Sequence, residues 1–275
     1  VWLYAAFVAG MLLVGPFHAH LGDVYRRKNL FLFPAIGMAA VGVGYAYAEQ
    51  WVHCCLLALL QGGCFALAMV GDLTVTIDIT HSSRRTAGNL TFAWIGRMGM
   101  MVGCCIGVWL LQKVGFQQLT LVAAAAMLLG CLFEMRVYLP FRAPIGVPMV
   151  TIDRFLLPRA WLPAIGVVLL AASVGHLMPL LLTGDFCPLI GLGILAVGVI
   201  PLVCLFVRLS HHCQRGTANA SCYQAMDVGI MLGLSLSYLN LDAGLIHREA
   251  LSWGLIAMLF LLLVAYPYYR SHRLR

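Results

Sequence analysis

The most constraining feature of the sequence is a series of apolar runs, each roughly 17 to 25 residues long, separated by short polar stretches. A hydrocarbon core of about 30 Å is crossed by about 20 helical residues. The runs therefore predict membrane-spanning helices, because a backbone in lipid must satisfy its own hydrogen bonds. A β-barrel is not indicated, since its strands would show segments of about ten residues with alternating polarity.

The composition agrees with this interpretation. Hydrophobic residues make up 62% of the chain and charged residues 10%, and the mean hydropathy is +0.94, which lies outside the range of a soluble domain. We expect an all-α polytopic membrane protein whose first partner is the lipid bilayer. About nine spans are predicted, with boundaries uncertain by several residues. They lie near residues 1–17, 29–48, 53–78, 87–111, 118–138, 160–182, 186–208, 218–238 and 248–269.

The basic residues predict the orientation. Of the 17 Lys and Arg residues, all but Lys113, Arg248 and the intraspan Arg97 fall on one side of this arrangement. Cytoplasmic loops retain such residues. We therefore expect a multi-pass protein of the bacterial inner membrane, with its N-terminus outside and its C-terminus in the cytoplasm. The net charge of +7 then reflects topology and attraction to anionic lipid. No basic run interleaved with aromatic residues indicates a nucleic-acid partner.

The ten cysteines indicate neither a metal site nor a cofactor. Most lie within or beside predicted spans, where a thiol packs as a small apolar group. None forms a CxxC pair or a Cys/His set with zinc spacing. The adjacent His211, His212 and Cys213 are interpreted as part of a solvated loop. We expect no metal and no cofactor.

An internal repeat links the two parts of the chain. The segment from Arg85 to Asn89, followed by Gly99 and Gly103, recurs at a constant offset of 130 residues. The second copy runs from Arg215 to Asn219 and is followed by Gly229 and Gly233. Both copies lie where a cytoplasmic loop enters an outward-running helix. Many transporters are built from such duplicated halves around a central site.

The loop from Ala19 to Lys28 carries a family resemblance. It resembles the signature between the second and third helices of the major facilitator superfamily, Gly-x-Leu-x-Asp-Arg-x-Gly-Arg-Arg. The residues that fit it are Leu21, Asp23, Arg27 and Lys28, and those that depart from it are Ala19, Val24 and Arg26. A short loop with one carboxylate and several cations can hold a helix end by charge-assisted hydrogen bonds and then exchange partners as helices shift. The alternative is an ordinary positively charged cytoplasmic loop.

Gly99, Gly103 and Gly107 resemble the glycine ladder in the fifth helix of the family's exporters, with Cys104 where proline is usual. Small residues at every fourth position form a groove that allows close approach of another helix. The ladder therefore favours an exporter, although helix packing alone also explains it.

The resemblance implies a bundle of two pseudo-repeated halves with about nine of the family's twelve helices. The first span corresponds to the family's second helix, and two helices are missing from the second half. We expect an N-terminal half at 1–138, a cytoplasmic connector at 139–159 with several prolines, and a C-terminal half at 160–275.

Four ionisable residues lie at predicted bilayer depth: Asp72, Arg97, His176 and Asp227. Such groups are costly unless they are paired or line an aqueous cavity. Arg97 and Asp227 are related by the repeat offset and could pair or flank a substrate path. An alternative is an ion pair between Asp72 and Arg97 within one hairpin. His176 is either a proton relay or a hydrogen-bonded packing residue.

These features together predict a secondary transporter, not an enzyme. We expect a monomer that moves a drug-like or sugar-like small molecule by alternating access, with proton-coupled efflux (antiport) as the mechanism implied by the resemblance. Polar residues suited to contact a solute are Gln61, Thr74, Thr76, Trp94, Tyr223 and Gln224. Two alternatives stay open. One is a membrane enzyme acting on lipid or lipid-linked sugar, for which the loops offer only scattered His18, His20, Asp23, His81 and His211; the other is a non-transporting remnant.

Overall fold

The structure is a computed structural model that describes residues 2–80, 85–138, 146–152, 155–211, 214–238 and 243–272. The described residues are helical or irregular, with no β-strand among them. They divide into two compact units. One unit contains residues 2–89 and 109–155, and the other contains residues 90–108 and 156–275. Each unit is considered separately below.

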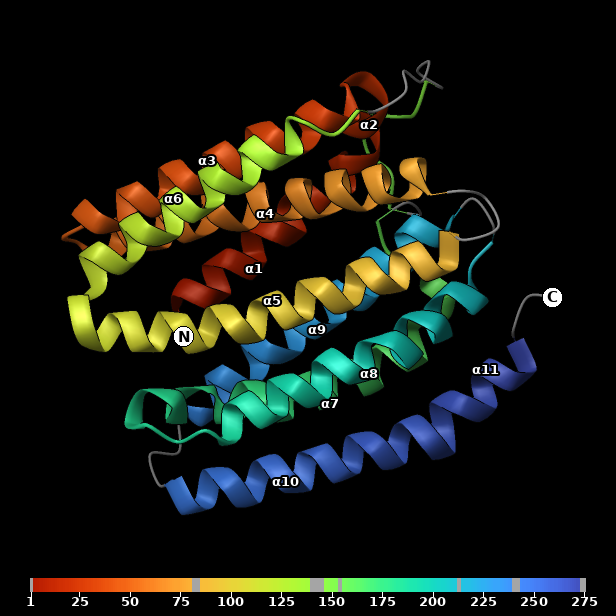
Figure 1. Cartoon of the computed structure of the whole chain (residues 1–275). Coiled ribbons are helices and arrows are strands. Elements are labelled where there is room, and N and C mark those ends of the chain that lie inside the picture. Colours follow the sequence, from red (N-terminus) through yellow and green to blue (C-terminus); the bar gives the residue numbers. More distant parts are fainter. Residues whose placement is uncertain are drawn as a thin grey trace. The chain divides into compact units, whose positions relative to one another are not determined.

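The first of these units is built from α1, α2, α3, α4, α6 and the two ends of α5 (Figure 1). Helix α4 packs against both α1 and α3, and α6 packs along the other side of α3. Pro16 lies in the 3₁₀ turn between α1 and α2, where its missing N–H is not needed. The bounds are α1 Trp2–Val14, α2 His18–Val24, α3 Arg27–Tyr47, α4 Trp51–Ile79, α5 Arg85–Val114 and α6 Phe116–Glu134.

The other unit contains the middle of α5 and the helices that follow the connector. Helix α7 packs against α9, α10 and α8, and α9 also packs against α8. Figure 1 shows α10 continuing through a π-helical turn, Leu261–Ala265, into α11 as one rod. Pro267 explains this wider turn, because its ring excludes the usual helical bond to the carbonyl of Leu263. The bounds are α7 Trp161–Leu177, α8 Cys187–Leu209, α9 Arg215–Ser237, α10 Ala243–Phe260 and α11 Tyr266–His272.

The prediction of an all-α polytopic fold is confirmed. Within the described ranges, eight segments are long and apolar enough to cross a membrane. The ninth predicted span, near 218–238, is the helix α9, which has the length but a more polar sequence. Its polarity has a structural reason, since α9 is buried along most of its length and presents little surface to lipid. Helix α10 begins at Ala243, five residues before the predicted boundary.

Glycines let helix backbones touch inside each unit. In the second unit, a Cβ added at Gly233 would lie 2.6 Å from the backbone nitrogen of His176 and would also collide with the carbonyl oxygen of Ala172. Gly229 faces the carbonyl oxygen of Val168 in the same way. Helices α7 and α9 therefore pack backbone against backbone along a Gly-x-x-x-Gly face, an arrangement typical of membrane helices.

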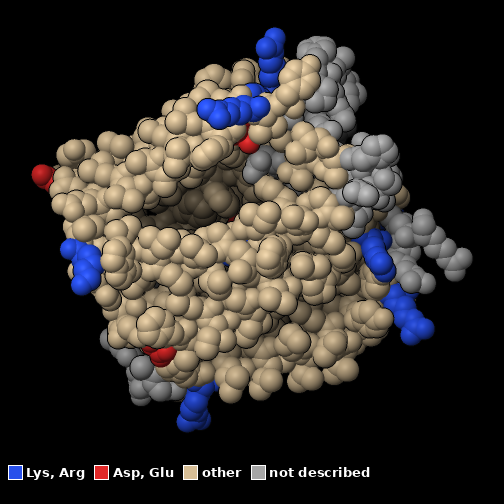
Figure 2. Space-filling view, in the orientation of Figure 1, with Lys and Arg blue, Asp and Glu red and all other residues tan. Residues whose placement is uncertain are grey.

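The surface agrees with a lipid environment. The face in Figure 2 is almost entirely free of charged side chains, and the Lys, Arg, Asp and Glu residues on it are few and separate. Large apolar side chains on α10, among them Leu251, Leu255 and Leu259, are exposed. In water such a surface would favour aggregation, whereas in a bilayer it faces acyl chains.

Candidate functional site

A buried ion pair joins α5 to α9 in the second unit. The Nη1 atom of Arg97 lies 3.6 Å from Oδ1 of Asp227, and their side chains are 11% and 7% exposed. The distance is that of an ion pair and is too long for a hydrogen bond. The guanidinium also lies over the Tyr223 ring, 5.2 Å from its centroid, within the range of a cation–π interaction. Asp227 is one of the two partners that the sequence left open for Arg97; the side chain of the other, Asp72, lies outside the described ones.

Asp227 ends a polar stripe on α9. Asn219, Tyr223 and Asp227 follow one another at four-residue spacing and so share one helix face, and Gln224 lies beside them. All four side chains are buried, and Asn219 is fully so. Five of their polar atoms have no hydrogen-bond partner among the described residues: Asn219 Oδ1 and Nδ2, Tyr223 OH, Gln224 Oε1 and Asp227 Oδ2.

Such a stripe is unusual in a folded interior. A buried polar atom without a partner costs about 1–3 kcal/mol, so five such atoms on one helix would lower the stability of the folded state substantially. Native structures retain groups of this kind mainly where water, an ion or a ligand supplies the missing bonds. The stripe is therefore the strongest candidate for a solute-contacting surface in this unit.

A second buried contact lies between α7 and α10. The His176 imidazole is almost fully buried, and its Nε2 lies 3.1 Å from Oε2 of Glu249. Its Nδ1 is 3.3 Å from the carbonyl oxygen of Gly233, and its ring stacks on Trp253 with a centroid distance of 6.0 Å. His176 lies in the last turn of α7, and a 3₁₀ segment that begins at Met178 continues the same apolar segment to Thr183.

Glu249 is a site residue that sequence reasoning missed. The predicted span begins near residue 248, which puts Glu249 at its edge. The earlier start of α10 places Glu249 nearly two turns inside the helix. A comparison of depth could have indicated it, since His176 lies seven residues before the end of its helical segment at Thr183 and Glu249 lies six residues after the start of α10 at Ala243.

The family loop ties two segments of the first unit together. The Asp23 carboxylate accepts hydrogen bonds from the N–H groups of Gly146 and Val147, at 2.7 and 2.9 Å. Lys28 donates to the carbonyl oxygens of Met135 and Val137, the second at 2.9 Å. Lys28 thus holds the C-terminal end of α6, where a cation is favoured by the free carbonyl groups. The exchange of partners during transport stays a prediction.

Two histidines at the family loop, His18 and His20, make hydrogen-bonding contacts with the backbone of the same unit. His20 Nδ1 lies 2.8 Å from the carbonyl oxygen of Val147, and His18 contacts the carbonyl oxygen of Gly15. Leu21, the remaining described member of the family motif, lies in α2. The His20 contact joins the loop to the connector, whereas the His18 contact is local. Among the residues described there, neither contact brings together a catalytic nucleophile or a set of metal ligands.

The glycine ladder faces open space within its own unit. A Cβ added at Gly99, Gly103 or Gly107 would meet no atom of the described residues within 4 Å. Their repeat counterparts Gly229 and Gly233, by contrast, are in backbone contact with α7. The two copies of the repeat therefore use the same residue type in different surroundings, and the close approach expected at the ladder stays a prediction.

The helix entrances of the repeat correspond in the structure. Helix α5 is described from Arg85 and α9 from Arg215, and the equivalent Asn89 and Asn219 are both buried. Five candidate residues named from the sequence have side chains outside those that the structure describes: Arg27, Asp72, Thr74, Arg85 and Arg215.

The comparison with family models decides the assignment. The Major Facilitator Superfamily model matches residues 2–146, which is more than half of the chain. The chain belongs to the major facilitator superfamily. This is a family of membrane transporters, and the match covers the loop containing Asp23 and Lys28 together with the Gly99 ladder. None of the curated proteins searched matches the chain.

Membership in the major facilitator superfamily agrees with the multi-pass helical architecture and with a transport role. The matched region ends shortly after α6, so the helices that carry Asp227 and His176 lie beyond it. Their roles have to be argued from the contacts described above.

Proposed function

We propose that the chain is a secondary transporter that exports a small, hydrogen-bonding solute in exchange for protons. The observation that carries the proposal is the stripe of buried, unpartnered polar atoms on α9, beside the ion pair of Arg97 and Asp227. The family supplies the transport function, and the specific assignments below belong to the proposal.

The solute class follows from the chemistry of the stripe. Asn219 and Gln224 offer amide oxygens, Asn219 also offers an amide nitrogen, and Tyr223 offers a hydroxyl. These neutral donors and acceptors suit hydroxyl-rich or amide-bearing solutes. A lipophilic cation would leave most of these atoms without partners, at about 1–3 kcal/mol each. We therefore favour the sugar-like solute over the drug-like one.

The coupling role is assigned to Asp227. One carboxylate oxygen faces Arg97, and the other has no partner among the described residues. A buried carboxylate can hold its charge and accept a hydrogen bond from the solute, or it can take up a proton when the guanidinium moves away. Binding a solute and binding a proton would then compete for one group, which is the requirement for exchange. His176 is a second coupling candidate because it is buried and close to a carboxylate.

The resemblance of Gly99, Gly103 and Gly107 to an exporter ladder supports the outward direction. The uneven distribution of basic residues supports a cytoplasmic location for the loop that contains Asp23 and Lys28. We further propose a monomer in the bacterial inner membrane. Protons, the solute and the lipid bilayer are then its partners.

The proposal is tested in inverted membrane vesicles loaded with a pH-sensitive fluorescent dye. After respiration acidifies the vesicles, glucose and lactose are added in one series and ethidium in another. We expect the sugars to release protons from vesicles containing the chain, and ethidium to release few or none. Asp227→Asn should abolish the release, because an amide cannot exchange a proton. Asn219→Ala should weaken the response to sugar about tenfold, the equivalent of losing one buried hydrogen bond.

Glu49→Gln is the matched control, since it makes the same carboxylate-to-amide change at an exposed position in the loop between α3 and α4. It should behave as the unmodified chain. Proton release that persists in Asp227→Asn would exclude the coupling role. A response to ethidium but not to sugars would exclude the solute class. A well-folded chain that releases protons with neither would support the remnant alternative.

A further inference from the structure

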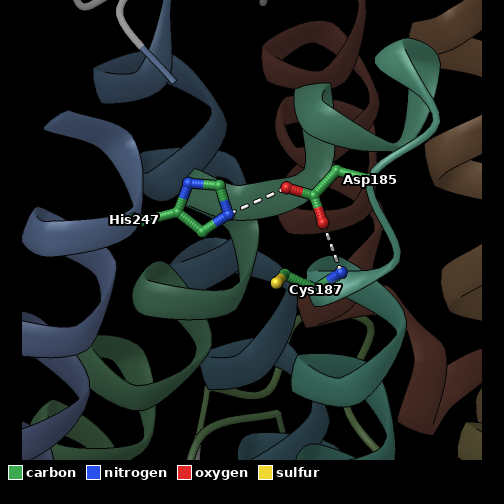
Figure 3. A group of neighbouring side chains, drawn as sticks. All are labelled: Asp185, Cys187 and His247. Atoms are coloured by element: carbon green, nitrogen blue, oxygen red, sulfur yellow. Dashed lines mark hydrogen bonds and ion pairs between the residues drawn. The ribbon is translucent and has the colours of Figure 1, made fainter. Parts of the chain in front are cut away.

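Three residues with metal-binding side chains meet at one end of the second unit. Asp185 lies in the turn before α8, Cys187 is the first residue of α8, and His247 lies in the second turn of α10. Figure 3 shows the carboxylate of Asp185 between the His247 ring and the main chain of Cys187, with the Cys187 sulfur beside them. No spacing pattern in the sequence indicates this group, because His247 is far from the other two residues along the chain.

The three donor atoms are close enough to share one ion. One side-chain donor from each residue lies within 4.8 Å of the other two. His247 Nε2 is 2.8 Å from Asp185 Oδ2, and the Cys187 N–H donates to Asp185 Oδ1 at 2.9 Å. These two contacts hold the Asp185 carboxylate in place between the other two residues.

The geometry needs only a small adjustment to accept zinc. Zinc binds thiolate at about 2.3 Å and imidazole or carboxylate at about 2.0–2.2 Å, usually as a tetrahedron. Ligand atoms in such a tetrahedron are about 3.3–3.8 Å apart. The imidazole and carboxylate would separate slightly, and the sulfur would approach them. The imidazole and carboxylate side chains are 37% and 29% exposed, so an ion can enter from water without opening the unit.

The donor set selects the kind of ion. Sulfur, nitrogen and oxygen together suit borderline divalent ions such as Zn²⁺, whereas Mg²⁺ and Ca²⁺ prefer oxygen alone. One carboxylate and one thiolate carry two negative charges, which balance a divalent cation. Three protein ligands leave the fourth position for water, as in exchangeable zinc sites.

We propose that Asp185, Cys187 and His247 form a binding site for Zn²⁺ that links the start of α8 to the start of α10. By the charge-based topology, this end of the helices faces the outside of the cell. The inference does not depend on the proposed solute or on proton coupling. The competing explanation is a hydrogen-bonded contact that binds no metal.

The experiment uses the purified full chain in detergent, titrated with Co²⁺ as a spectroscopic stand-in for Zn²⁺. We expect one Co²⁺ per chain, with the near-ultraviolet charge-transfer band of a cobalt-bound thiolate and with displacement by Zn²⁺. Cys187→Ser should abolish the band, and His247→Ala should weaken binding at least tenfold. Asp185→Asn should weaken it as well, because it removes one of the two negative charges.

Cys105→Ser is the matched control. Cys105 is an exposed free thiol of the same unit, in α5, so its loss should leave both the band and the affinity unchanged. The proposal is overturned if the unmodified chain shows no thiolate band, or if the band survives in Cys187→Ser and disappears in Cys105→Ser. Thermal unfolding supplies a further readout, since Zn²⁺ should raise the midpoint of the unmodified chain and not that of His247→Ala.

Discussion

Replacing Gly233 with alanine should destabilise the chain, whereas the same replacement at its repeat counterpart Gly103 should not. A methyl group at Gly233 would lie 2.6 Å from the backbone nitrogen of His176 and collide with the carbonyl oxygen of Ala172. Both neighbours are backbone atoms of α7, so no side chain can rotate away. Helices α7 and α9 would have to separate.

The expected magnitude follows from the packing. Adding a methyl group to a close-packed interior typically costs about 1–3 kcal/mol, and alanine regains up to about 1 kcal/mol of helix propensity over glycine. We expect a net loss of about 1–2 kcal/mol for Gly233→Ala. At about 2–4 °C per kcal/mol for a chain of this size, the unfolding midpoint should fall by roughly 2–8 °C. At Gly103 nothing opposes the gain in propensity, since no atom of the described residues lies within 4 Å.

The assay is thermal unfolding of both purified variants in one detergent, followed by intrinsic tryptophan fluorescence. Trp253 stacks on His176, so its emission reports on the contact that Gly233→Ala disturbs. An equal midpoint for the two variants would refute the argument that the α7–α9 interface depends on backbone contact. A fall for Gly103→Ala alone would show that the ladder is the packed face.

Two further predictions concern the family loop and the topology. Asp23→Asn removes the carboxylate charge that strengthens two hydrogen bonds from N–H groups of the connector, and such charge-assisted bonds contribute about 1.5–3 kcal/mol each. We therefore expect trypsin to cleave the variant faster within residues 139–155, as followed by gel electrophoresis. The control Glu49→Gln should be cleaved at the rate of the unmodified chain. If the cleavage rates agree, Asp23 does not hold the connector. Tags placed at Gln50 and after Arg275 should react with an impermeant reagent from opposite faces of the membrane, and labelling of both from one face would contradict the nine-span topology.

The helices could be predicted from sequence, while most contacts between them could not. Span length and hydropathy depend on neighbouring residues only. The nine predicted runs correspond to α1, to α3 through α9, and to the rod of α10 and α11, whereas α2 lies in the segment predicted as a loop. The bonds of Asp23 and Lys28 join the loop to residues more than one hundred positions away. A single sequence contains no signal for such partners beyond their charge. Arg97 and Asp227 are the exception, because the two residues occupy equivalent positions in the repeat, and this suggested from the sequence that they could pair.

The position of Glu249 shows why boundaries matter at a site. A shift of five residues in the start of α10 changes this carboxylate from a surface group to the neighbour of a buried imidazole. The same shift brings His247 into the helix beside Asp185. Predicted ends are uncertain by several residues, which is enough to hide both contacts. For ionisable residues within two turns of a span end, the distance from that end should therefore be compared between neighbouring spans, because residues at equal depth can be in contact.

Helix α9 also shows how hydropathy and charge constrain one another. Among the described residues, α9 is too polar to be identified as a membrane span from its composition. Its 23 residues nevertheless extend about 34 Å, which is enough to cross the hydrocarbon core. If α9 did not cross, Arg270 and Arg273 would lie on the opposite side from Arg208 and Arg215, and the segregation of basic residues would be lost. The charge pattern therefore predicts that α9 spans the membrane, and its burial explains how it tolerates Asn219, Gln224 and Asp227. A helix that retains four buried polar side chains at such cost, in a transporter, is where we expect the solute to bind.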